Sequence, residues 1–230
     1  MFMPFFDRTM ILLIPALALA MYAQHKVRST YEKMSRVRAS NGRTGADMAK
    51  YLLSVNGLAG VEVVPVEGVL SDHYDPAKKR VCLSPGNFQN ASIAAVSVAA
   101  HECGHALQHA HGYAPLSFRT AFVPAAQLGS TLAMPLFFIG MIARLPFLLT
   151  AGILFFAGAV AFQLVTLPVE FDASRRALRE LESRGLLASG QEVGLAKKVL
   201  DAAALTYVAA ATMALLQLVR LLLIRNSRNN

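Results

Sequence analysis

Four long apolar runs constrain the fold of this chain more than any other feature. Hydrophobic residues make up 55% of the 230 residues and charged residues only 16%, whereas a soluble domain averages about 25% charged residues. A helix needs about 20 apolar residues to cross the hydrocarbon core of a bilayer. The sequence therefore predicts a mainly α-helical membrane protein with about four transmembrane helices, formed by the runs 9–23, 128–142, 147–167 and 202–224.

These runs divide the chain into five predicted segments. Little positive charge precedes the first run, and the basic stretch 25–28 follows it, which is typical of a retained anchor and not of a cleaved signal peptide. Arg220 lies inside the last run, so the sequence leaves open whether that run crosses fully. The segments are an N-terminal transmembrane anchor (4–23), a globular core (25–118), a transmembrane helical hairpin (126–167), a polar helical segment (168–201) and a C-terminal transmembrane helix (202–224).

The charge distribution predicts both the surroundings and the orientation of the chain. The net charge is +8, but the basic residues lie beside apolar runs and no stretch combines them with stacking aromatics. Attraction to anionic lipid headgroups explains them, and we expect no nucleic-acid partner. Seventeen of the 22 Lys and Arg residues fall on the side that holds the core and the polar segment, or at its boundary. The positive-inside tendency places that side in the cytoplasm, so we expect an integral protein of the cell inner or plasma membrane.

The core reads as a small α+β domain. A helix is expected from Thr44 to about Asn56, and strands at 61–66 and 81–84 are expected to form a small antiparallel sheet. A second helix is expected over about 92–110. Its first turns, 92–100, are small and apolar, so it should be buried on nearly every side.

The second of these helices carries the motif His101-Glu102-Cys103-Gly104-His105. Histidines at positions i and i+4 project from the same side of a helix and can reach one metal ion. Zinc suits imidazole, and two histidines with a carboxylate leave a position for water. Glu102 would then act as the general base, because zinc lowers the pKa of water towards neutrality and a nearby base completes the deprotonation.

The residues alone leave two candidates for the third zinc ligand. His111 has the spacing of the pattern H-E-x-x-H-x-x-G-x-x-H, but Gln108 occupies the position where that pattern turns the chain at glycine. His109 would require three successive turns of a rigid helix to reach one ion. Glu170 is a carboxylate at the end of an apolar run, where it is costly unless it is paired or bound to metal. Its alternative role is an ordinary helix-capping acid at the membrane interface.

Three segments together resemble the YugP-like family of membrane zinc metallopeptidases, namely 72–76, 99–109 and 167–177. The resemblance covers nearly the whole chain. The chain is also distantly similar to the gluzincins of the HtpX and CAAX-prenyl-protease type, which implies a gluzincin-like metallopeptidase domain. By position, the resemblance implies that Glu170 completes the zinc site. Ser174 stands where the wider group has aspartate, and Asp172 is a candidate to replace that aspartate as a second-shell residue.

Further candidates lie around this site. His73 and Tyr74 lie on a possible edge strand, where a substrate could pair by β-addition, and either of them or Arg175 is a candidate to stabilise the oxyanion. The alternative for that segment is a structural turn in which Asp72 and Asp75 bind backbone groups. Cys103 has no separate base, so we interpret it as a small buried residue and not as a nucleophile.

The sequence thus predicts a membrane-embedded zinc metalloendopeptidase whose substrates are membrane or membrane-proximal polypeptides. Its expected cofactor is Zn²⁺, and its expected partners are a polypeptide substrate and the lipid bilayer, with oligomeric state and adaptor partners left open. The alternative hypothesis is a non-catalytic, zinc-stabilised membrane scaffold or adaptor. Glu102 argues against the alternative, since a purely structural zinc site does not require it.

Overall fold

The computed structural model describes residues 8–188 and 190–227. Residues 4–7 of the predicted N-terminal anchor lie outside the described residues. The chain forms two compact units, and their boundary falls inside four long helices. The first unit comprises Met1–Gln24, Phe118–Leu167 and Thr206–Asn230, and the second comprises His25–Ser117 and Pro168–Leu205.

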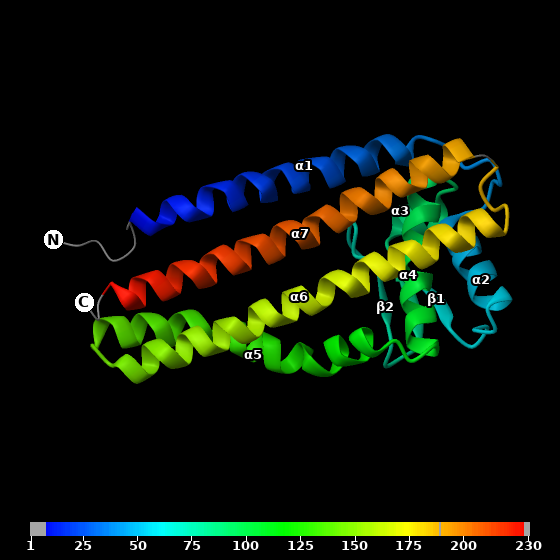
Figure 1. The fold of residues 1–230 in the computed structure, drawn as a ribbon. Coiled ribbons are helices and arrows are strands. Elements are labelled where there is room, and N and C mark those ends of the chain that lie inside the picture. Colours follow the sequence, from blue (N-terminus) through cyan, green and yellow to red (C-terminus); the bar gives the residue numbers. More distant parts are fainter. Residues whose placement is uncertain (1–7, 189, 228–230) are drawn as a thin grey trace. The chain divides into compact units, whose positions relative to one another are not determined.

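Long apolar helices make up the first unit (Figure 1). Within the described residues, four helical stretches are long and apolar enough to cross a membrane, which confirms the predicted mainly α-helical membrane fold. Arg220 does not interrupt the last of them, and its Nε lies 3.3 Å from Thr9 Oγ1. The helices are a 3₁₀ turn Arg8–Leu13 with α1 (Ile14–Ser35), then α5 (Ala114–Ile142), α6 (Pro146–Ser183) and α7 (Gly190–Asn226).

Helices α5 and α6 form the tight antiparallel hairpin that the sequence predicts. The turn between them places Arg144 at a φ of 57°. The helices approach so closely that a Cβ added at Gly140 would lie 2.5 Å from the Leu149 backbone nitrogen, and one at Gly152 would lie 2.7 Å from the Ala133 carbonyl oxygen. Small residues at such crossings allow the close van der Waals packing on which helix association in a membrane depends.

The second unit contains a small sheet and the helices that pack around it (Figure 1). The predicted helix near Thr44 is α2 (Gly45–Val55), and Thr44 and Asp47 form its capping box. The predicted strands are β1 (Glu62–Pro65) and β3 (Arg80–Leu83), and β2 (His73–Asp75) is a third strand. A five-residue helix, α3 (Pro85–Gln89), follows the sheet.

The prediction of an antiparallel sheet is wrong for β1 and β3. The strand order is β1-β3-β2, with β1 parallel to β3 and β2 antiparallel to β3. Parallel neighbours need a crossover of about a dozen residues or more, and residues 66–79, which include β2, provide it. In the described sheet β2 is an edge strand, as the sequence predicts for His73 and Tyr74.

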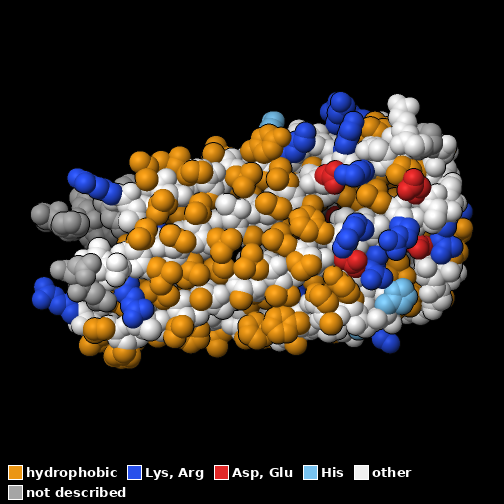
Figure 2. Space-filling model, viewed as in Figure 1, with side chains coloured by type: hydrophobic (Ala, Val, Ile, Leu, Met, Phe, Trp, Pro, Cys, Tyr) orange, Lys and Arg blue, Asp and Glu red, His pale blue; other side chains and the backbone are white. Residues whose placement is uncertain are grey.

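The motif helix is α4 (Ile93–Ala110), which confirms its predicted extent. Ser92 accepts a hydrogen bond from the Ala95 backbone and caps its first turn. The alanine- and valine-rich start of the helix is buried against α2, α3 and the sheet. On the face shown in Figure 2, hydrophobic side chains cover the long helices of the first unit, and charged side chains gather over the second unit.

Candidate metal centre

Two helices of the second unit bring His101, His105 and Glu170 together. The histidines lie one turn apart on α4, and Glu170 lies on α6 just after Pro168. Glu170 Oε2 lies 3.2 Å from His101 Nε2 and 3.5 Å from His105 Nε2. Glu170 is 2% exposed and His105 is 7% exposed. This group therefore combines two imidazoles and one carboxylate in a largely buried position.

The donor set is compatible with a zinc ion. Bonds of about 2.0–2.1 Å in tetrahedral geometry place neighbouring ligand atoms about 3.3 Å apart. The two measured separations lie close to that value, and one potential ligand atom from each of the three residues lies within 4.8 Å of the others. Three protein ligands would leave one coordination position for water or substrate, as in catalytic zinc sites.

The outer nitrogen of each imidazole already has a hydrogen-bond partner. His101 Nδ1 lies 3.1 Å from Ser174 Oγ, and His105 Nδ1 lies 3.0 Å from Gln108 Oε1. Such partners orient a histidine and leave its Nε2 available to a metal ion. Ser174 thus contacts His101 through its hydroxyl group.

Glu102 lies between the two histidines in sequence and is buried at 7% exposure. Burial raises the pKa of its carboxyl group above the usual value, and the neighbouring imidazoles of His101 and His105 oppose that shift. Glu102 is thus a buried carboxyl group whose charge interacts with both imidazoles of the candidate metal site.

Gln108 is the site residue that the sequence analysis missed. From the sequence, Gln108 was noted only because it occupies the position at which the pattern H-E-x-x-H-x-x-G-x-x-H has glycine. In the structure it is 0% exposed and contacts both His105 and α6. The available signal was helical spacing, because residues 101, 105 and 108 share one face of α4.

His111 and His109 take other positions. α4 continues past Gln108 to Ala110, as expected, and His111 is its C-cap. His111 Nδ1 lies 3.1 Å from the Arg176 guanidinium. His109 Nδ1 lies 2.8 Å from the Tyr74 hydroxyl. The group of possible metal ligands found among the described residues includes neither of them.

The other predicted residues lie near α4 or on α6. Asp172 accepts hydrogen bonds from Gln108 and Arg176, whereas Arg175 is 71% exposed and lies 3.7 Å from Asp172. On β2, His73 is exposed and its Nδ1 lies 2.8 Å from the Ser71 carbonyl oxygen.

Asp72, just before β2, and Asp75, its last residue, bind backbone groups, as the structural alternative for this segment expects. Asp72 accepts from the Ser84 backbone nitrogen, and Asp75 accepts from the backbone nitrogens of Ala77 and Lys78. These contacts fix the ends of the edge strand, and they leave its outer side unpaired within the described sheet.

Cys103 is buried at 1% exposure, and its thiol points to the Ala49 carbonyl oxygen at 3.6 Å. Burial raises the pKa of this thiol, with a smaller contribution from Glu102. Because a thiolate is the reactive form of cysteine, the structure favours a packing role for Cys103.

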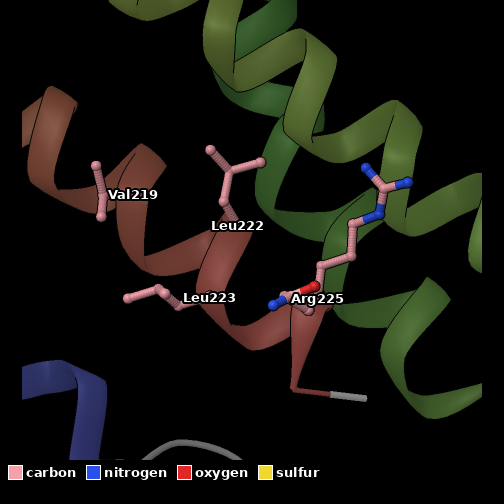
Figure 3. Close-up of a pocket in the computed structure, with 5 residues that line it drawn as sticks. Val219, Leu222, Leu223 and Arg225 are labelled. Atoms are coloured by element: carbon pink, nitrogen blue, oxygen red, sulfur yellow. The ribbon is translucent and has the colours of Figure 1, made fainter. Parts of the chain in front are cut away.

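A pocket of about 470 Å³ lies elsewhere, near the end of α7 (Figure 3). Its lining contains one cation and one amide among aliphatic side chains: Val219, Leu222, Leu223, Arg225 and Asn226. This lining offers neither an imidazole nor a carboxylate, so the candidate catalytic chemistry lies with α4 and α6.

Comparison with known proteins decides the family. A family described as "Putative neutral zinc metallopeptidase" matches residues 9–226. The chain belongs to this family. It is also similar to "Putative membrane protease YugP" of Bacillus subtilis (strain 168), with 49% identity over 213 residues, which cover 93% of this chain and 94% of that protein. No solved structure matches the chain. The predicted family resemblance is therefore confirmed, and this zinc metallopeptidase family member is an integral membrane protein.

Proposed function

We propose that this chain is a zinc-dependent endopeptidase of the gluzincin type, with His101, His105 and Glu170 as zinc ligands and Glu102 as the catalytic base. The observation that carries the proposal is the convergence of the three side chains from α4 and α6, with separations that fit one zinc ion. When bound, zinc would act as a Lewis acid and lower the pKa of water.

The protein's own residues would then perform the remaining tasks. Glu102 accepts a proton from the water that attacks the scissile carbonyl carbon, and returns a proton to the leaving amine. Substrate can pair with the outer edge of β2, where backbone groups would supply hydrogen bonds. His73, Tyr74 and Arg175 remain the candidates to stabilise the negative charge that develops on the carbonyl oxygen.

The proposed substrates are membrane or membrane-proximal polypeptides, cleaved on the cytoplasmic side. The substrate class rests on the membrane spans, and the orientation rests on the excess of basic residues in the core and the polar segment. In this proposal, segments 25–118 and 168–201 build the catalytic part, and 4–23, 126–167 and 202–224 form the membrane part. The buried Glu102 disfavours the scaffold alternative, because a structural zinc site has no use for an additional buried acid.

The full chain, purified in detergent, tests the proposal. We expect about one zinc per chain and cleavage of an unfolded membrane polypeptide. A zinc chelator should stop the cleavage, and added zinc should restore it. A chain that binds zinc but cleaves none of a panel of unfolded membrane polypeptides would support the scaffold alternative, and a chain that binds no zinc would refute both functions.

A further inference from the structure

Gln108 joins one proposed zinc ligand to the helix that carries another. It lies three residues after His105 on α4 and is fully buried. Its Oε1 lies 3.0 Å from His105 Nδ1. Its Nε2 donates to the Val169 carbonyl oxygen at 2.8 Å and to Asp172 Oδ2 at 2.9 Å. All the polar atoms of this side chain are therefore engaged.

The chemistry of these partners fixes the orientation of the amide. A backbone carbonyl can only accept a hydrogen bond, and so can an ionised carboxylate. The Val169 carbonyl oxygen meets this condition at 2.8 Å, and Asp172 Oδ2 already accepts a hydrogen bond from Arg176 Nε at 2.6 Å. The NH₂ group of Gln108 must therefore face α6, and its carbonyl oxygen must face His105.

This orientation in turn fixes the tautomer of His105. Gln108 Oε1 can only accept, so His105 Nδ1 must carry the proton and donate it. A neutral imidazole that is protonated on Nδ1 has its lone pair on Nε2. That atom faces Glu170 at 3.5 Å. Ser174 cannot impose the same choice on His101, because a hydroxyl group can donate or accept.

We infer that Gln108 is a positioning residue of the metal site, which sets the tautomer of His105 and its place relative to Glu170. The inference rests on the proposed function. Val169 immediately precedes Glu170, so the bond to its carbonyl ties the amide to the segment of α6 that presents the carboxylate. Asp172, itself held by Arg176, anchors the same amide from the next turn.

The test compares Gln108→Leu with the wild type, both as full chains in detergent. Leucine has a similar volume but makes none of the three hydrogen bonds. We expect zinc affinity, measured by competition with a chelator, to fall about 10–100-fold, the usual effect of losing an outer-shell partner. The visible absorption spectrum of the Co²⁺-loaded protein, which reports ligand geometry, should change as well.

Asn87→Leu is the matched control. Asn87 is another buried amide of the second unit, and it bonds to Tyr31 and Asp72 instead of to the metal site. Both variants should lower thermal stability, because each leaves buried polar partners unsatisfied. Only Gln108→Leu should change zinc affinity and the Co²⁺ spectrum.

Asp172→Ala is a second variant, for the case that Gln108→Leu does not fold. It removes one anchor of the amide at a partly exposed position and should weaken zinc binding by less than Gln108→Leu. If Gln108→Leu folds, wild-type zinc affinity together with an unchanged Co²⁺ spectrum would overturn the inference. If only Asp172→Ala folds, wild-type zinc affinity in that variant would overturn it. Failure of the wild type to bind zinc would overturn the proposed function itself.

Discussion

Gly104 of the motif helix lies against the backbone of Ala173 on α6. A Cβ added to Gly104 would lie 2.5 Å from the Ala173 carbonyl oxygen, closer than such atoms can approach. Ala173 is three residues from Glu170, and Gly104 is one residue from His105. The absence of a side chain at this position therefore allows α4 to approach the part of α6 that carries the proposed third ligand.

We predict that Gly104→Ala separates the two helices and weakens zinc binding. Forcing a methyl group against backbone costs typically about 1–3 kcal/mol, and here it would also move Glu170 away from the histidines. Isothermal titration with zinc measures the loss of affinity. Gly194→Ala on α7 is the control, since a Cβ at that position meets nothing within 4 Å and alanine favours a helix by up to about 1 kcal/mol. Equal zinc affinity in the two variants would contradict this account of Gly104.

The two candidates for the third ligand differ in their predicted effects. Glu170→Ala should weaken zinc binding by more than the roughly 10–100-fold that an outer-shell loss causes. His111→Ala should keep an affinity close to that of the wild type, because His111 contacts Arg176 at the end of α4. Zinc content after dialysis against a chelator distinguishes them. The reverse ranking would place the third ligand at His111.

Cys103 provides a test against nucleophilic catalysis. Because its thiol is buried with a raised pKa, we predict that iodoacetamide leaves proteolysis of the native protein unchanged. Cys103→Ala should keep its zinc and most of its activity, with a small loss of stability from the cavity. Complete loss of cleavage in a folded, zinc-loaded Cys103→Ala protein would argue for a thiol mechanism.

The orientation in the membrane is testable with single added cysteines. We predict that Val69→Cys, near β2, is protected from a membrane-impermeant maleimide in intact cells, whereas Ala143→Cys, in the α5–α6 turn, is labelled. Both positions are exposed, and the two native cysteines are buried. Permeabilised cells should label both variants, which controls for reactivity. Labelling of Val69→Cys in intact cells would place the candidate site outside the cytoplasm.

Much of the fold was predictable because its signals are local. The length of the apolar runs predicts the spans, and Thr44 and Ser92 mark the starts of α2 and α4 through their capping hydrogen bonds. The direction of β1 relative to β3 was not predictable in this way. It depends on how residues 66–79 cross between the strands, and short apolar strands carry no signal for their partner.

For the candidate site, the sequence predicted which three residues would meet as proposed ligands, but not the groups that contact them. His101 and His105 follow from helical spacing, and Glu170 follows from its costly position together with the family resemblance. In the structure Glu170 lies beside both histidines, although at least 65 residues of sequence separate it from them. Gln108 and Ser174 could not be assigned roles, because their hydrogen bonds depend on how α4 packs against α6.

The most direct test of the account is the Glu102→Gln variant, in which the proposed base loses its charge but keeps its shape. Zinc content and cleavage of an unfolded membrane polypeptide would be measured on the same purified sample as the wild type. We predict about one zinc per chain, as for the wild type, and cleavage reduced at least about 100-fold, as expected on removal of a general base. Wild-type cleavage by the zinc-loaded variant would contradict the proposed mechanism.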